Sequence, residues 1–337
     1  MISVLAVAPV DHPGGAEIGL LRLLPRLRDA GWAVTLTTPG DGPVRDRALA
    51  AGLHHERLVL GGLARGAGAR AVSTWPAARR LARAHDVVYL NGGVCGRLIP
   101  ALPRGARAVL HVHDLVDRVP RIWRRAEAVL ADSRATADRL GRLRAHVVGC
   151  PIEAEPAAVS PPWQPDGRPV VGYVGRIEER KGVLDLAAAA PRLREAGARV
   201  VVIGDDALAA DETYVRRVDS APGVERHGGI DGAAGLMGAL DVLVLPSRAE
   251  PFGTVLAEAM NAGTPVVATR VGGLPEVVED GVTGRLVAPG DPEALAGAVL
   301  EVLGRREEMG AAGRERARRW HADAYAERVA AILAGRP

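Results

Sequence analysis

The sequence predicts an α/β protein with two successive doubly wound domains, each built on a parallel sheet. Short β-branched runs alternate with longer amphipathic stretches rich in Ala, Leu and Arg, which is the pattern of βαβ units. A Pro-rich stretch, "PIEAEPAAVSPPWQPDG" at 151–167, interrupts this pattern, which then begins again. The chain has 337 residues, enough for two domains that each bury a core.

The first domain is expected to cover 1–150, with 151–167 as the linker. Its apolar runs predict strands at 2–8, 33–38, 57–60, 87–91, 107–112, 127–131 and 146–149. Amphipathic stretches between them predict helices, for example at 16–30 and 133–141.

The second domain is expected to cover 168–319. Its strands are predicted at 169–174, 199–203, 223–227, 241–245, 265–268 and 285–287, and its helices at 181–196, 254–262, 273–279 and 291–303. Two such domains would place a ligand between them, at the carboxyl ends of their strands. The last residues, 320–337, read as an amphipathic helix.

Composition and charge argue against nucleic-acid binding, disulfide bonds and membrane insertion. The net charge is only +3, and no basic stripe is interleaved with aromatic residues, so nucleic acid is not expected. Cys95 and Cys150 are too few for a disulfide framework and indicate thiols in a reducing compartment. The start of the chain lacks a basic signal-peptide region, and no apolar run is long enough to span a bilayer. We therefore expect a cytoplasmic protein whose Arg-rich segments, such as "RIWRRAE", allow at most peripheral membrane contact.

The stretch "VGRIEERKG" at 174–182 contains Lys181, the only lysine among 43 Lys and Arg residues. In a composition that otherwise uses arginine, a single retained lysine suggests a specific need for its compact charge. Arg176 and Lys181 follow an apolar strand and precede a helix, where two cations suit a diphosphate. The alternative is a solvated basic turn.

A second motif, "EPFGTVLAE" at 250–258, holds two glutamates with seven residues between them. Glu250 lies in the loop before a predicted helix and Glu258 one turn inside it, so both carboxylates flank a helix N-terminus. Free N–H groups at Gly253 and Thr254 would form an anion site there, and the carboxylates would accept bonds from sugar hydroxyls. Phe252, the only phenylalanine, would form one wall. The alternative is two surface glutamates and a core phenylalanine.

With these motifs in order, residues 169–300 resemble the donor-binding domain of retaining GT-B glycosyltransferases of family 4, also called group 1. The motifs are "GRIEERKG", "LPSRAE", "EPFGTVLAE" and "AMNAGTPVVATRVGGLPEVV". The resemblance implies a GT-B fold, in which two Rossmann-like domains face each other across a cleft and the C-terminal helix returns to the first domain. It also implies transfer of a sugar from a nucleotide sugar to an acceptor hydroxyl, with retention of anomeric configuration.

The resemblance assigns roles to residues of the second domain. Arg176 and Lys181 would hold the diphosphate, Glu250 the donor sugar and Glu258 the ribose. The remaining donor-site candidates are Gly175, the amides of Phe252, Gly253 and Thr254, and the base-framing pair Arg226 and His227. No Asp-x-Asp follows a strand, so no metal is expected, and no cofactor beyond the nucleotide sugar.

The first domain matches more loosely. Gly14 and Gly15 would form a glycine loop that lets the backbone approach the donor. His113, in "HVHDLV", would contact the donor sugar, which completes a catalytic group with Arg176, Lys181 and Glu250. The acceptor candidates are Asn91, Asp114 and Arg134. Purely structural roles remain open for neighbouring residues: helix capping for Glu17 and Ser133, and burial in the core for His111.

Four rival functions compare less well with the sequence or remain as alternatives. A dehydrogenase lacks support because no GxGxxG follows the first strand or the strand at 169–174. A phosphorylase using pyridoxal phosphate would need Lys181 as its Schiff base. A sugar-nucleotide epimerase and a non-catalytic nucleotide-sugar-binding subunit remain alternatives. The resemblance favours a UDP-sugar donor and a carbohydrate or small-molecule acceptor, in antibiotic, oligosaccharide or cell-envelope biosynthesis, and leaves the oligomeric state open.

Overall fold

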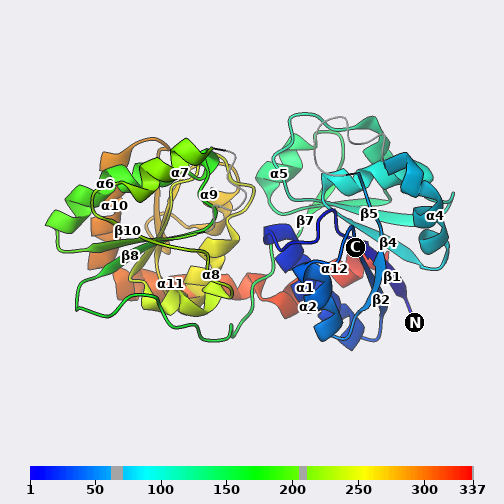
Figure 1. The fold of residues 1–337 in the computed structure, drawn as a ribbon, viewed down its shortest axis with the longest axis horizontal. Helices are drawn as coiled ribbons and strands as arrows, with labels where there is room; N and C mark the ends of the chain where they lie inside the picture. Colours follow the sequence, from blue (N-terminus) through cyan, green and yellow to red (C-terminus); the bar gives the residue numbers. More distant parts are fainter. Residues whose placement is uncertain (62–70, 205–210, 336–337) are drawn as a thin grey trace. The chain divides into compact units, whose positions relative to one another are not determined.

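The structure, a computed structural model, describes residues 1–61, 71–204 and 211–335. The chain forms two compact units (Figure 1). The first unit comprises Met1–Ile152 and His321–Pro337, and the second comprises Glu153–Trp320. Each is described by itself below.

The first unit is built on a parallel sheet of seven strands in the order β3-β2-β1-β4-β5-β6-β7. The strands are β1 (Ser3–Val7), β2 (Ala33–Thr38), β3 (His54–Arg57), β4 (Val87–Asn91), β5 (Arg107–Val112), β6 (Ala128–Ala131) and β7 (Ala145–Val147). Strand order reverses between β1 and β4, and ligands of doubly wound sheets bind at the carboxyl ends of strands beside such a reversal.

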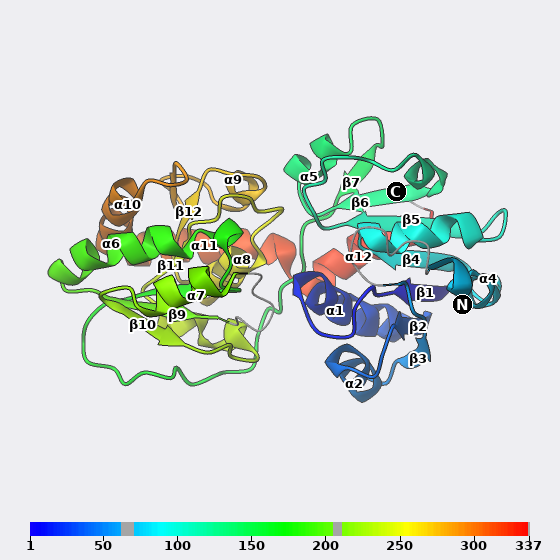
Figure 2. The same cartoon turned by 45° about the horizontal axis from the view of Figure 1, so that its top comes forward.

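Helices cover both faces of this sheet. They are α1 (Gly15–Asp29), α2 (Pro43–Ala50), α4 (Trp75–Arg83), α5 (Arg134–Arg139) and α12 (Ala322–Leu333), with 3₁₀ segments η2 (Gly93–Ala101) and η3 (Arg121–Arg125). Alternate residues of β1 point to opposite faces, so Val4 and Ala6 join one core and Leu5 and Val7 the other. The C-terminal helix α12 packs beside α1 on the first of these cores (Figure 1, Figure 2).

The second unit repeats the plan with six parallel strands in the order β10-β9-β8-β11-β12-β13. They are β8 (Val170–Val174), β9 (Arg199–Ile203), β10 (Val224–His227), β11 (Val242–Leu245), β12 (Val266–Thr269) and β13 (Gly284–Val287). All five residues of β8 are buried, as expected for a strand covered on both faces. The order reverses between β8 and β11, so the loops after these two strands lie together.

In the part of this unit that the structure describes, α helices surround the sheet, with α6 packed on α10 and α8 on α11. They are α6 (Val183–Glu195), α7 (Glu212–Asp219), α8 (Thr254–Ala262), α9 (Leu274–Val277), α10 (Pro292–Gly304) and α11 (Arg306–Ala317). The prediction of two doubly wound parallel-sheet domains is confirmed.

Several predicted boundaries differ from the structure, and two of these differences have a clear physical cause. The helix expected from 181 begins at Val183, because Gly182 takes a left-handed conformation with φ +66° and ends a short 3₁₀ turn that contains Lys181. The strand expected at 57–60 lies earlier, at His54–Arg57, where the backbone pairs with β2. For β3, hydrogen bonding to β2 decides where the strand lies, and the apolar run at 57–60 does not.

The stretch predicted as a linker, 151–167, lies mostly along the second unit. Val159 donates its N–H to the Gly235 carbonyl at 3.3 Å, and the Asn261 side chain donates to the Ala154 carbonyl at 3.0 Å. Within the described residues, no helix is both long enough and apolar enough to cross a membrane.

Candidate active site

The loop after β8 carries Arg176 and Lys181. It begins at Gly175, whose φ of +154° favours glycine and whose N–H donates to the Ile203 carbonyl at 3.0 Å. The Arg176 side chain is 54% exposed and lies 3.3 Å from the Glu178 carboxylate. This guanidinium is therefore held loosely at the surface, where a ligand anion can reach it.

Main-chain contacts join this loop to the loop after β11. The Arg248 N–H donates to the Arg180 carbonyl at 2.8 Å, and the Arg180 guanidinium donates to the Ala249 carbonyl at 2.9 Å. Gly182 approaches the Pro246 carbonyl so closely that no Cβ would fit there. The reversal in strand order thus brings the two predicted motifs into one local structure.

Lys181 forms an ion pair with Glu250 at the centre of the joined loops. Its Nζ lies 2.6 Å from Glu250 Oε2, and the two side chains are 15% and 9% exposed. The Ser247 hydroxyl donates to the same carboxylate oxygen at 3.2 Å. An ammonium suits this narrow space because it concentrates its charge at one nitrogen, whereas a guanidinium needs a wide planar site.

Three residues that the sequence analysis did not single out support this pair. Arg180 and Arg248 bind the neighbouring loop as described, and Arg248 also pairs with the buried Asp185 at 2.9 Å. Both arginines lie inside the quoted motifs "GRIEERKG" and "LPSRAE". Their place within these motifs is the sequence signal that could have identified them, whereas no motif contains Asp185.

The N-terminus of α8 lies directly after Glu250. Gly253 is its N-cap residue, with a φ of +88° and no side-chain cap. Among the described residues, none accepts a hydrogen bond from the N–H of Gly253 or Thr254. Two unsatisfied donors and the helix dipole therefore stand next to the Lys181–Glu250 pair, an arrangement that favours an anion.

Phe252 and Glu258 flank this helix start. The Phe252 ring is buried and packs edge-on against Trp320, with ring centroids 5.6 Å apart. Its side chain therefore belongs to the core and does not line a wall, which leaves the main chain as the part of Phe252 near the anion site. Glu258 lies one turn into α8 and is partly buried.

Arg226 and His227 lie on β10, at the edge of the sheet and two strands away from β8. The Arg226 guanidinium donates to the Gly204 carbonyl at 2.9 Å and lies 3.3 Å from Asp219. Burial lowers the pKa of His227, so its imidazole is neutral at pH 7. The structure does not bring this pair into contact with Lys181 or Glu250.

In the first unit, the Glu17 side chain caps the start of α1 by binding the N–H of the N-cap residue, Gly14. The Gly14 N–H donates to Glu17 Oε2 at 3.2 Å, and burial raises the pKa of this carboxyl. A Cβ at Gly14 would press on the Glu17 carboxylate, whereas one at Gly15 would meet no atom within 4 Å. The capping role considered for Glu17 is therefore present in the structure.

His113 follows β5 and lies between Asn91 and Asp132. Its Nε2 is 2.9 Å from Asn91 Oδ1, and its Nδ1 is 3.0 Å from Asp132 Oδ2. Burial alone would lower the pKa of His113, but the Asp132 carboxylate outweighs it and the pKa is raised. Asp132 is not among the predicted site residues, although it directly precedes the predicted helix in "ADSRATADRL".

His111 lies behind His113, with ring centroids 3.9 Å apart. Its Nδ1 is 2.5 Å from the Tyr89 hydroxyl, and its Nε2 makes a short, poorly aligned contact of 2.8 Å with Asp132. Burial and the neighbouring His113 lower the pKa of His111 to about 4. It is thus a buried neutral residue, in line with the simple burial considered for it.

The other acceptor candidates lie nearby in the sequence but not in this cluster. Asp114 and Arg134 are exposed, at the ends of β5 and β6 respectively. Ser133 caps α5 by accepting the Thr136 N–H at 3.0 Å, so its capping role is present.

Among the described residues, His111, His113 and Asp132 are the acidic, histidine or cysteine side chains close enough to share a metal ion. Their nitrogens and carboxylate oxygens contact one another directly at 2.8 to 3.1 Å. These are the distances of a hydrogen-bonded cluster. That the reaction needs no metal stays a prediction.

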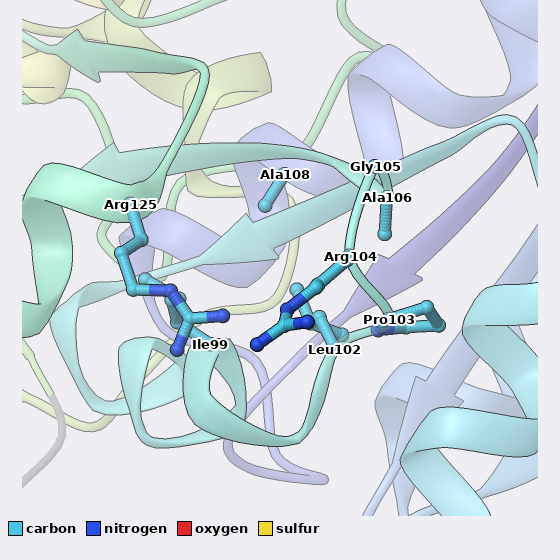
Figure 3. A pocket seen from close by; sticks show the side chains of 8 residues that line it. All are labelled: Ile99, Leu102, Pro103, Arg104, Gly105, Ala106, Ala108 and Arg125. Atoms are coloured by element: carbon cyan, nitrogen blue, oxygen red, sulfur yellow. The ribbon is translucent and has the colours of Figure 1, made fainter.

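A cavity of about 280 Å³ lies elsewhere in the first unit, at the amino end of β5. Arg104 and Arg125 extend over it (Figure 3). The rest of its lining is apolar or glycine: Ile99, Leu102, Pro103, Gly105, Ala106 and Ala108. The cavity holds none of the predicted site residues, which lie at carboxyl ends of strands.

Comparison with known proteins was consistent with these features. Residues 13–155 match the family model "Glycosyltransferase Family 4", and residues 168–305 match "Glycosyl transferases group 1". A glycogen synthase of Mycobacterium tuberculosis is 42% identical over 136 residues, which is 39% of this chain and 33% of that protein. A D-inositol 3-phosphate glycosyltransferase of Xylanimonas cellulosilytica is 35% identical over 243 residues, 62% of this chain and 56% of that protein.

The fold is also found in solved structures. Anabaena HepE, crystallised with UDP and glucose, superimposes with a TM-score of 0.85 at 23% identity, over 99% of this chain and all of that one. The matches to the curated relatives span a third to about half of their length. Both halves of the chain thus match glycosyltransferase family models. The chain therefore belongs to the group 1, or family 4, glycosyltransferases and has their GT-B fold.

Proposed function

We propose that this protein transfers a sugar from a nucleotide sugar, with a UDP-sugar as the preferred donor, to an acceptor hydroxyl with retention of anomeric configuration. One observation carries the proposal. The Lys181–Glu250 ion pair stands beside the unsatisfied amides of Gly253 and Thr254, at the reversal of strand order in the second unit. Membership of the family and the UDP and glucose bound to HepE support the choice of donor.

The groups of this site match the charges that develop during transfer. Breaking the bond between the sugar and the diphosphate builds negative charge on the leaving diphosphate. Lys181, Arg176 and the amides at the start of α8 would stabilise that charge. Glu250 would accept hydrogen bonds from the sugar hydroxyls while Lys181 keeps its carboxylate in place.

Retention follows when the acceptor attacks from the face that the diphosphate leaves. The bond between the anomeric carbon and the phosphate oxygen breaks, and a bond to the acceptor oxygen forms on the same face. The acceptor hydroxyl gives its proton to the departing phosphate, so no protein carboxylate has to act as a nucleophile. Bound water must be excluded during this step, since it would compete as an acceptor.

The first experiment measures release of nucleoside diphosphate from UDP-, GDP- and ADP-glucose in the presence of a panel of sugar acceptors. Lys181→Ala should abolish most of the release. The matched control is Arg305→Ala, which removes a cation that pairs with Glu308 on the surface. Proton NMR of the product then reports its anomeric configuration, and inverted product would refute retention.

The same experiment separates the alternatives. Binding of a nucleotide in a thermal-shift assay without any release would indicate a non-catalytic binding subunit. An altered sugar, formed from the nucleotide sugar without an acceptor, would indicate an epimerase. Absence of both binding and release with all donors would refute the proposal.

A further inference from the structure

A row of buried polar side chains crosses the first unit and ends at His113. It begins with Tyr325 on α12, whose hydroxyl is hydrogen-bonded to that of Tyr89 on β4. Tyr89 contacts His111, and both His111 and His113 contact Asp132. Tyr89, Tyr325, His111 and Asp132 are each less than 5% exposed, whereas His113 retains 15% exposure. The row thus reaches solvent through His113.

Both nitrogens of His113 face hydrogen-bond acceptors. Asn91 donates through its Nδ2 to the Ala16 carbonyl, at 3.4 Å, so its Oδ1 is the atom presented to His113 Nε2. Asp132, acting as a carboxylate, can only accept. Two ring nitrogens between two acceptors require two ring protons, and an imidazole with two protons is a cation.

The Asp132 carboxylate compensates the positive charge of only one histidine. A buried carboxylate is stable when an opposite charge and hydrogen bonds compensate for its loss of water. His113 supplies the charge, and its Nδ1–H donates a hydrogen bond to the carboxylate. His111 itself is kept neutral by burial and by the charge of His113, with its pKa lowered to about 4. The pair of histidines therefore carries one positive charge and not two.

We propose that Asp132 is a positioning residue, which holds His113 as an imidazolium whose Nε2–H binds a substrate oxygen in place of Asn91 Oδ1. This inference rests on the proposed function, since it assigns the charge state in which His113 serves sugar transfer. The oxygen is one that carries negative charge or accepts strongly, such as a phosphate or sugar oxygen. On binding, Asn91 releases Nε2–H and the substrate oxygen takes it.

The groups around His113 all favour this charge state. Asp132 follows β6, Glu17 comes from α1 and Asp114 follows β5, and each carboxylate raises the pKa of His113. Burial opposes them, and the carboxylates outweigh it. As pH rises through the pKa of His113 the imidazolium is lost, so transfer should fall on the alkaline side.

The first test reads the charge directly and needs no substrate. In ¹⁵N-labelled protein, long-range ¹H–¹⁵N correlation distinguishes an imidazolium from each neutral tautomer, and His113→Gln and His111→Gln assign the two rings. At pH 7, His113 should have both nitrogens protonated and His111 one. In Asp132→Asn, His113 should be neutral at pH 7, and in Asp132→Glu it should again be charged. A neutral His113 in the unaltered protein would overturn the proposal.

The second test is the pH profile of nucleoside diphosphate release from UDP-glucose. Asp132→Asn should move the alkaline limb to lower pH. At pH values above both limbs, the rate should fall by about tenfold for each unit by which the limb moves. Rates of the two proteins should converge at low pH, which a general loss of structure would not produce. Asp132→Glu should return the limb toward its original position.

The matched control is Asp117→Asn, which makes the same chemical change at a side chain that is 93% exposed and pairs with Arg139. It should leave the limb unmoved. A limb that stays in place in a folded Asp132→Asn protein, as judged by its melting temperature, would overturn the proposal. If no nucleotide sugar is turned over at all, the proposed function fails, and the NMR result still decides the charge of His113.

Discussion

Replacing Lys181 by alanine tests the central feature of the candidate site. The substitution removes an ammonium that lies 2.6 Å from Glu250 and should stabilise the leaving diphosphate. Losing one preorganised donor of this kind costs a factor of about 10² to 10³ in rate, or about 3 to 4 kcal/mol. We expect a fall of at least about 10² in the rate of nucleoside diphosphate release.

The structure also predicts a cost in stability. Without Lys181, the Ser247 hydroxyl, at 3.2 Å, is the hydrogen-bond partner that the described residues leave to the buried Glu250 carboxylate. Removing one partner of a buried ion pair costs about 3 to 5 kcal/mol, and the partial exposure of Lys181 places this case lower, at about 2 to 3 kcal/mol. In a domain of this size, the melting temperature of the second unit should fall by about 5 to 10 °C.

A double-mutant cycle with Glu250→Gln separates the two effects. The double variant should be more stable than Lys181→Ala alone by about 1 to 2 kcal/mol, because it no longer buries an uncompensated charge. Its rate should remain low. Lys181→Arg keeps the charge but needs a wider site, so it should recover stability better than rate. A near-unaltered rate in Lys181→Ala would refute the assignment, and additive stabilities would refute the ion pair.

Three further outcomes are expected. Gly182→Ala should destabilise the second unit by more than about 2 kcal/mol, because it places a Cβ in a left-handed residue against the Pro246 carbonyl. The control is Gly197→Ala, at a φ of +86° with open space around it, which should cost only about 1 to 2 kcal/mol. Urea unfolding measures both losses. The pKa of His111 is about 4 in the folded protein and 6.5 in the unfolded chain, so between these pH values only the unfolded chain binds a proton at this residue. The free energy of unfolding should therefore fall by about 3 kcal/mol as pH falls from 6.5 to 4. His111→Gln should lose this acid sensitivity, and equal acid sensitivity in both proteins would contradict it. EDTA should change the rate of nucleoside diphosphate release by less than about twofold, since the cationic groups take the role that a metal would otherwise have. A loss of rate that added metal restores would contradict this expectation.

Local patterns were enough to predict both sheets and most of their elements. The strands at 33–38, 87–91 and 107–112 match the structure residue for residue, because runs rich in β-branched and apolar residues favour strands that are buried on both faces. One of the differences has a local cause and the other depends on strand pairing. At 181 the positive φ of Gly182 delays the helix, and at 57–60 pairing with β2 selects earlier, polar residues.

The sequence by itself determined the fold class and placed both donor motifs after strands, since hydrophobic period and glycine positions are properties of short segments. Partners of the charged groups were decided only by the tertiary structure. Lys181 and Glu250 are 69 residues apart, and His113 and Asp132 are 19 apart. They meet because β8 neighbours β11 and β5 neighbours β6. Strand order depends on the packing of the whole sheet, which no short segment encodes, so the single lysine could be noticed in the sequence but paired only in the fold.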